Sequence, residues 1–100
     1  MTIKLTEKQR KHLRGLGHAL KPVVYVAEAG LSPPVMHEVR TALAHHELIK
    51  VSVRVGDREV RSATVEQLAT DTGAVVVQRI GNTALFYKRN PEKNRITLPA

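Results

Sequence analysis

Cysteine and tryptophan are absent from this 100-residue sequence, and its aromatic residues are one phenylalanine and two tyrosines. The lack of cysteine excludes disulfides, thiolate nucleophiles, iron–sulfur clusters and cysteine-ligated zinc. No apolar run approaches the ~18 residues that a membrane-spanning helix requires. The N-terminal segment MTIKLTEKQR also lacks the apolar stretch of a signal peptide. We therefore expect a cytoplasmic protein with no membrane partner.

Motifs of enzyme chemistry are missing as well. The sequence contains no G-x-S-x-G, no P-loop, no G-x-G-x-x-G and no H-E-x-x-H. Its five histidines do not gather on one face; His37 and His46, nine positions apart, would be about 180° out of phase on a helix. We expect no catalytic residue, no metal and no cofactor, hence a binding protein rather than an enzyme.

Positive charge is concentrated at the two ends of the chain. The net charge of +7 divides into +5 for residues 1–21, −1 for residues 22–87 and +3 for residues 88–100. This distribution favours a polyanionic partner, most often nucleic acid. A soluble domain with basic termini and no such partner is the alternative.

The length of 100 residues predicts one domain over residues 1–100, and the prolines of the tail predict that it is irregular from about residue 90. Thr6 and Gln9 form a capping-box pattern, followed by a leucine stripe at Leu13, Leu16 and Leu20. We place helices at about residues 6–17, 33–46 and 57–72, and strands at about residues 23–26, 48–55, 74–80 and 84–87. The strand at 48–55 alternates in polarity, which is typical of a half-buried strand.

The predicted element order is α-β-α-β-α-β-β. Helical crossovers make the first three strands parallel, and the turn at Gly81 and Asn82 makes the last strand antiparallel to the third. The expected fold is therefore of the α/β class, a two-layer arrangement of helices with a four-stranded mixed sheet.

The candidate RNA contacts are basic side chains near the two ends. One group precedes the first strand and the other follows the last strand: Lys8, Lys11, Arg14 and Lys21, then Lys88 and Arg89, with Lys93 and Arg95 beyond. Whether the fold joins these groups is left open. Phe86 and Tyr87 are expected to pack inside, so phosphate contacts and shape would carry the binding rather than stacked bases.

The turn at residues 27–30, between a strand and a helix, is a further candidate. Free N–H groups at a helix N-terminus can bind an anion, although an ordinary turn explains the pattern equally well.

Several blocks of the sequence resemble the YhbY-type proteins, which are stand-alone CRM domains (chloroplast RNA splicing and ribosome maturation). The resemblance covers nearly the whole chain, and its blocks are LRGLGHALKPVV at 13–24, GLS at 30–32, ALAHHELIKV at 42–51, TGA at 72–74 and IGNTAL at 80–85. It implies a fold similar to the C-terminal domain of translation initiation factor 3. It also implies binding to precursors of the large ribosomal subunit.

The resemblance further implies a KH-like G-x-x-G loop that contacts RNA, which maps here to Ala27, Glu28, Ala29 and Gly30. This sequence departs from the pattern, because Ala27 replaces the first glycine and Glu28 adds a negative charge. Two prolines, Pro33 and Pro34, also remove amide donors. We expect this protein to depend more on its basic ends than on the loop.

The predicted function is binding of ribosomal RNA during ribosome assembly by a monomer. Two alternatives stay open. The chain could be a protein-binding module on the ribosome, or a DNA-binding regulator, which would need a dimer or a helix shaped for the major groove.

Overall fold

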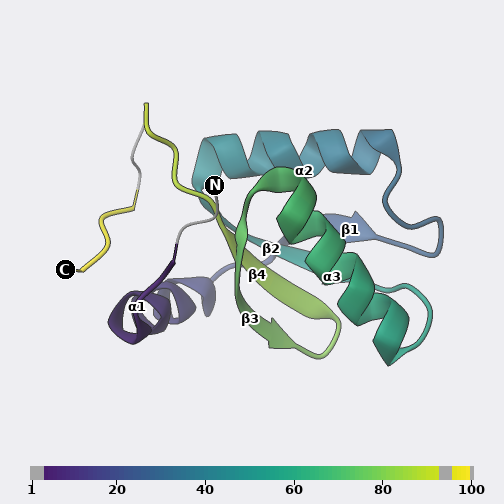
Figure 1. Cartoon of the computed structure of the whole chain (residues 1–100), viewed down its shortest axis with the longest axis horizontal. Helices are drawn as coiled ribbons and strands as arrows, with labels where there is room; N and C mark the ends of the chain where they lie inside the picture. The colour runs from purple at the N-terminus through teal and green to yellow at the C-terminus, as the bar shows by residue number, and fades with distance from the viewer. Residues whose placement is uncertain (1–3, 93–95, 100) are drawn as a thin grey trace.

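The computed structural model describes residues 4–92 and 96–99, and its elements follow the predicted order (Figure 1). Three helices and four strands alternate along the chain, in the order α1 (Glu7–Gly17), β1 (Pro22–Val26), α2 (Pro33–His46), β2 (Leu48–Val53), α3 (Arg58–Thr72), β3 (Val75–Ile80) and β4 (Thr83–Tyr87). The described part of the tail after residue 88 contains no helix or strand. These observations confirm the predicted fold class.

The four strands form one mixed sheet in the order β1-β2-β4-β3. Strand β1 pairs in parallel with β2, and β4 lies antiparallel to both β2 and β3. The first three strands therefore run in one direction, as predicted. The last strand enters between β2 and β3, a placement that the element order alone did not specify.

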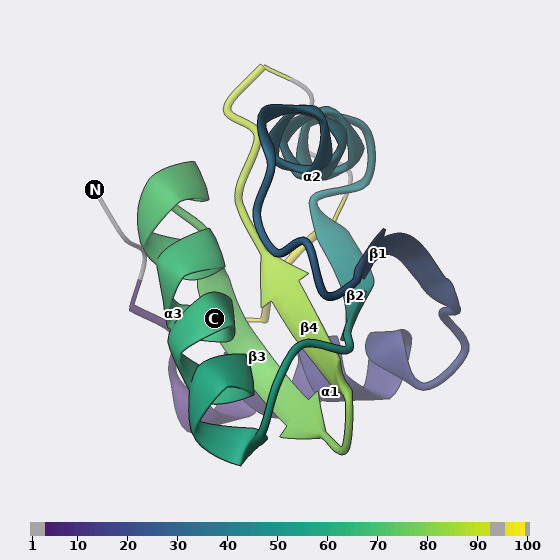
Figure 2. The same ribbon diagram turned by 90° about the vertical axis from the view of Figure 1, so that its right-hand side faces the viewer.

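Helices cover the two faces of the sheet unequally (Figure 2). Helices α2 and α3 pack on one face over the larger apolar cluster, whose buried members include Val51, Leu68 and Phe86. Helix α1 lies on the other face over a smaller cluster around Leu13 and Tyr87. Among the described residues, no helix is long and apolar enough to cross a membrane.

Local sequence signals explain where the helices begin and end. The Thr6 side chain accepts a hydrogen bond from the Gln9 amide while the Gln9 side chain accepts one from the Thr6 amide, which completes the predicted capping box. Asp57 caps α3 in a similar way. Gly73 ends α3 with a φ of 74°, a left-handed conformation that glycine adopts at little cost.

Burial differs from the periodic pattern of the sequence in two places. Of the three leucines at helical spacing only Leu13 is buried, whereas Leu16, in α1, and Leu20, after the end of α1, are 42% and 36% exposed. Helix α1 approaches the sheet through Gly17, which packs against Leu85 so closely that a Cβ would clash. The β2 strand is also more buried than predicted, with Ser52 buried and Lys50 half-buried.

The tail folds back onto the sheet through one buried carboxylate. Glu47 is fully buried at the end of α2, with a φ of 62°. Its Oε2 accepts a hydrogen bond from the Asn90 amide at 2.6 Å, and its Oε1 accepts one from the Ile96 amide at 2.8 Å. Glu47 therefore fixes where the C-terminal segment runs, and with it the position of the basic residues after β4.

Candidate nucleic-acid interface

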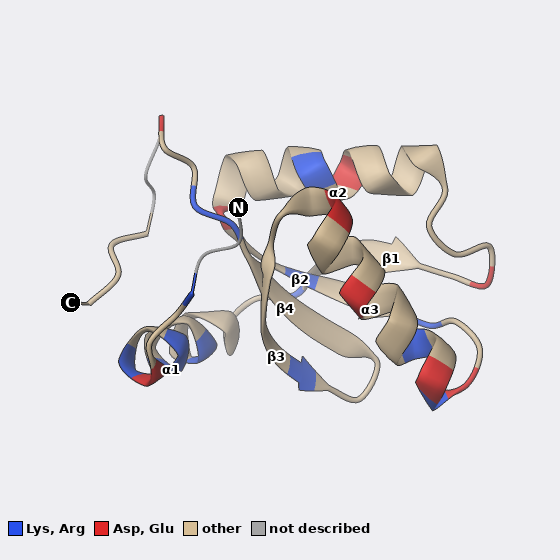
Figure 3. Ribbon diagram, viewed as in Figure 1, with Lys and Arg blue, Asp and Glu red and all other residues tan. Residues whose placement is uncertain are grey.

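Helix α1 presents a basic face to solvent. Lys8, Lys11 and Arg14 follow one another at intervals of three residues, which places them along one side of the helix. Lys8 and Lys11 are exposed and Arg14 is half-buried. Figure 3 shows several Lys and Arg residues on this helix, with a single acidic residue, Glu7, at its start. The geometry suits contact with several neighbouring phosphates.

Arg10, on the same helix, contacts the sheet. Its Nη1 donates hydrogen bonds to the carbonyl oxygens of Val76 and Val77, at 2.8 and 3.0 Å. The register of the β3–β4 pair shifts at this point, between Val76 and Gln78, and Arg10 satisfies carbonyls there. This side chain fastens α1 to the sheet.

The basic residues after β4 lie at the same end of the molecule as α1 (Figure 3). Arg89 lines a hollow together with Gln9 of α1 and residues 96–99 of the tail. Lys88 turns toward the other helices, with its ammonium group beside Gly73. The structure therefore brings Arg89 next to α1, and Lys88 and Arg89 both border a cleft with Arg40 between α2 and α3. The candidates Lys93 and Arg95 lie outside the described residues.

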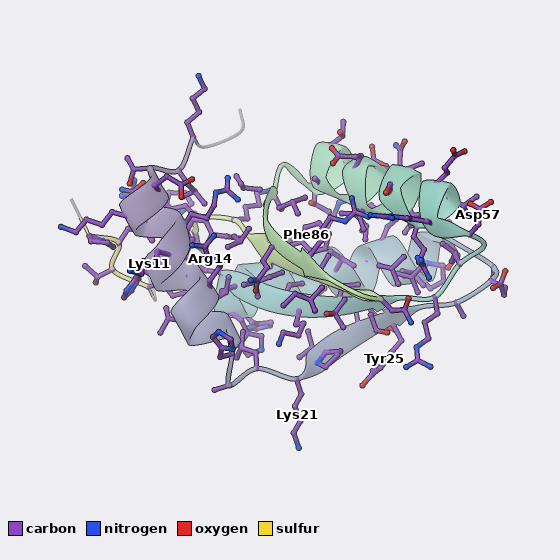
Figure 4. The ribbon with its side chains drawn as sticks, turned by 90° about the horizontal axis from the view of Figure 1, so that it is seen from below. Lys11, Arg14, Lys21, Tyr25, Asp57 and Phe86 are labelled. Atoms are coloured by element: carbon purple, nitrogen blue, oxygen red, sulfur yellow. The ribbon has the colours of Figure 1, made fainter. Side chains whose placement is uncertain are left out.

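Lys21 extends the basic surface along the sheet edge. It is exposed and points away from the body of the protein in Figure 4. Beside it runs an open groove of about 350 Å³, whose lining includes Leu16, Leu20, Val23 and Lys50. Tyr25, on the same edge strand, is 66% exposed. Apolar and basic side chains thus lie side by side where α1 leaves part of the sheet uncovered.

The loop at residues 27–30 lies at the opposite end of the long axis from α1 (Figure 1). It is a tight turn closed by a hydrogen bond from the Gly30 amide to the Ala27 carbonyl at 2.8 Å. Gly30 has a φ of 75°, so a glycine suits this position. Ala27, Glu28 and Ala29 are exposed.

The start of α2 offers few donors to an anion. Its first two residues, Pro33 and Pro34, have no N–H group. The Val35 amide donates to Ser32 Oγ at 3.4 Å, and the Met36 amide donates to the Ser32 carbonyl at 3.0 Å. The geometry agrees with the expectation that this loop contributes less than the basic ends do, although RNA contact by the candidate residues stays a prediction.

Phe86 and Tyr87 are both 1% exposed, on opposite faces of the central strand β4. The expectation that they pack inside is confirmed, so neither ring can stack on a base. Burial raises the pKa of the Tyr87 hydroxyl; the Glu47 carboxylate raises it further, and the Arg89 guanidinium lowers it in part. Tyr25 is the chain's one aromatic side chain on the surface.

Sequence reasoning missed a group of arginines in the middle of the chain. Arg58, Arg61 and Arg79 line one hollow, although residues 22–87 as a whole carry a net charge of −1. The summed charge of the segment hides this group because none of the seven acidic residues of 22–87 lines the hollow. The i, i+3 spacing of Arg58 and Arg61 on one helix was the available signal.

Comparison with known proteins decides the family. The CRS1/YhbY (CRM) domain family matches residues 5–88 of the chain. This protein belongs to the CRM domain family. The resemblance found in the sequence blocks is thereby confirmed.

Within residues 4–92 and 96–99, no group of three or more His, Asp or Glu side chains could hold a metal ion.

Bacterial relatives of this CRM protein match it over almost their full length. A probable RNA-binding protein of Pseudomonas aeruginosa is 43% identical over 91% of this chain and 88% of its own. An RNA-binding protein of Haemophilus influenzae is 42% identical over 95% of both chains. A probable RNA-binding protein of Bacillus subtilis is 37% identical over 95% of this chain and 99% of its own.

A solved structure shares the CRM fold described above. The solution structure of a hypothetical protein from Staphylococcus aureus superposes with a TM-score of 0.81 at 30% sequence identity. The match covers 96% of this chain and 100% of that chain. The order and packing of the elements are thus shared with a solved structure.

Proposed function

We propose that this protein binds ribosomal RNA within precursors of the large ribosomal subunit, as a monomeric, cytoplasmic, non-catalytic assembly factor. Membership of the CRM family and the names of the relatives, which are RNA-binding proteins, support an RNA partner. The choice of ribosomal RNA is the finer part of the proposal and follows from the resemblance to YhbY-type proteins.

The observation that carries the proposal is the basic face of α1. Lys8, Lys11 and Arg14 project from one side of this helix, and Arg89 adjoins it across the hollow at Gln9. Charges of one sign on a rigid helix attract phosphates and release their counterions. Because Phe86 and Tyr87 are buried, contact with the RNA backbone rather than base stacking supplies most of the affinity.

The first experiment is crosslinking in cells followed by sequencing of the attached RNA. The expected result is enrichment of large-subunit ribosomal RNA and its precursors over messenger RNA. Association with a ribosomal protein without any RNA crosslink would favour a protein-binding module. Equal or tighter binding to duplex DNA of matched length would favour a DNA-binding regulator.

A matched pair of variants tests the role of α1. Lys11→Gln with Arg14→Gln removes two positive charges from the basic face, and we expect the RNA affinity to fall about tenfold at low salt. The control, Thr41→Glu with Thr70→Glu, changes the net charge equally at exposed positions on α2 and α3. Equal losses in both variants would mean that overall charge, rather than this helix, attracts the RNA.

A further inference from the structure

A second basic site lies around the first turns of α3. Arg58 and Arg61 of this helix, Arg79 of β3, Ser62 and Gly81 line an open hollow of about 500 Å³. Three guanidinium groups therefore border one concave surface, and none of its described lining residues is acidic. Arginine is the side chain best suited to phosphate recognition, because its planar fork can donate two parallel hydrogen bonds.

Neutral partners hold two of these arginines in place. Arg61 Nη1 donates a hydrogen bond to Asn82 Oδ1 at 2.9 Å, and Arg79 Nη2 donates one to Ser62 Oγ at 2.8 Å. Each contact orders a guanidinium without neutralising its charge, and each leaves other N–H groups for a ligand. Ordering before binding reduces the entropy lost when the ligand arrives.

The neighbouring carboxylates of Asp57 and Glu59 do not line the hollow. Asp57 Oδ1 accepts a hydrogen bond from the Val60 amide at 3.0 Å and so caps the helix. Glu59 is exposed on α3 and is not among the residues that line the hollow. The hollow itself keeps a local excess of positive charge.

The Arg58 end of this hollow is far from the basic face of α1, whereas Arg79 lies two residues from Val77, whose carbonyl accepts a hydrogen bond from Arg10 of α1. Figure 4 shows Lys11 and Arg14 at one end of the molecule and Asp57, next to Arg58, at the other. The protein extends 38 Å along this axis. RNA contacts at Lys11 and at Arg58 would therefore lie toward opposite ends of the protein.

We infer that the hollow formed by Arg58, Arg61 and Arg79 is a second binding site, for the phosphodiester backbone of a separate RNA segment. The inference rests on the proposed RNA-binding function and extends it. The protein would hold two stretches of RNA at once, one on α1 and one at the start of α3.

The stoichiometry of binding to a short oligonucleotide tests this. A single-stranded RNA of about eight nucleotides is within the range that one small binding site covers, and native mass spectrometry counts the copies bound. Two copies per protein are expected for the wild type. One copy is expected for Arg58→Gln/Arg61→Gln/Arg79→Gln, and one for Lys8→Gln/Lys11→Gln/Arg14→Gln.

The outcomes separate this inference from the proposed function. One copy on the wild type, unchanged in the α3 triple variant but lost in the α1 variant, overturns the second site and leaves RNA binding by α1 intact. Absence of any binding to the wild type overturns both. Loss of all binding in the α3 triple variant alone, with the fold retained, would also contradict two independent sites.

Arg61 and Arg79 link α3 to the β3–β4 hairpin, so their loss in the triple variant also weakens the fold. Single variants at Arg58 test the site without this effect. Arg58 is exposed and no hydrogen bond of its side chain holds the described fold together. We expect Arg58→Gln to weaken binding of the second copy roughly fivefold, and Arg58→Lys to weaken it less. The control Thr70→Glu makes the same change in net charge further along α3. Equal effects of Arg58→Gln and Thr70→Glu would overturn the site.

Discussion

The two faces of the sheet are covered by different kinds of contact. On the face of α2 and α3, apolar side chains such as Leu68 and Phe86 fill the space and are almost fully buried. On the face of α1, a smaller apolar cluster is supplemented by polar contacts from Arg10 and Glu47, and Leu16 stays 42% exposed. One face is covered by apolar packing alone, whereas the other combines a smaller apolar cluster with polar contacts and a partly exposed leucine.

This difference explains how the basic side chains of α1 can face solvent while the helix stays attached to the sheet. Gln9 Nε2 donates a hydrogen bond to the Pro99 carbonyl at 3.1 Å, and Arg10 binds the carbonyls of β3. These directional contacts fix the helix although its apolar contact is small. The charged side of α1 is thereby held rigidly while it faces solvent, as a preorganised phosphate-binding surface requires.

The largest effect is expected from a cavity on the α2–α3 face. Phe86→Ala should lower the free energy of unfolding by about 4 kcal/mol, because a buried ring is lost and the space around it collapses only in part. Leu16→Ala, on the α1 face, should cost less than about 1 kcal/mol because the side chain is already partly hydrated. Denaturant titrations of both variants measure the difference. Equal losses would contradict the contrast between the faces.

The second-largest loss of stability is expected when the buried Glu47 carboxylate is removed. Glu47→Ala should destabilise the protein by about 3 kcal/mol, because the Asn90 and Ile96 amides lose a charged acceptor. Glu47→Gly should recover about 1 kcal/mol of that loss, since φ at this position is 62° and glycine relieves the strain. Amide exchange at Ile96 should rise in both variants. Unchanged exchange would show that Glu47 does not hold the tail.

A smaller effect is expected on how the stability of the fold changes with pH, through Tyr87 on the α1 face. The pKa of Tyr87 is raised above its usual value of 10.0, first by burial and then by the Glu47 carboxylate. The folded state thus holds the phenol proton more tightly than the unfolded chain does. The resulting stability is complete below pH 10 and is lost as the pH rises through the folded-state value. Tyr87→Phe should flatten the alkaline decline, and an identical decline in that variant would exclude Tyr87 as its source.

The smallest effect is expected at the exposed aromatic ring of the open sheet edge. If RNA is bound through its backbone, Tyr25→Ala should change the RNA affinity by less than about twofold. A stacked base would instead contribute about 1–3 kcal/mol, a loss of roughly fivefold or more. Tyr25→Phe, which keeps the ring, is the control. Loss in the alanine variant with retention in the phenylalanine variant would add a base-binding role to the α1 face.

Local signals made most of the fold predictable. The capping box at Thr6, the left-handed end of α3 at Gly73 and the tight turn at Gly81 each depend on a few neighbouring residues, so the sequence displays them directly. The exposure of Leu16 and Leu20 was not predictable in this way. It depends on how Gly17 meets Leu85, two residues that are far apart in the chain.

The candidate site was predictable only in part. The charges of α1 are close in sequence, and helical spacing places them together. The arginine hollow joins residues from α3 and β3, and its charge disappears when summed with the acidic residues of the same segment. The role of Glu47 was also not predictable from the sequence, because the amides that donate hydrogen bonds to its carboxylate belong to the distant tail.

The central position of β4 has a consequence for synthesis of the chain. Residues 83–87 are made after every other strand, yet they supply the hydrogen-bonding partner of both β2 and β3. Until they emerge, the backbone of β3 has no neighbour in the sheet and β2 is bonded on one side only. Completion of the sheet must therefore wait until residues 83–87 have been synthesised, and chains truncated before residue 83 would leave strand edges open to aggregation.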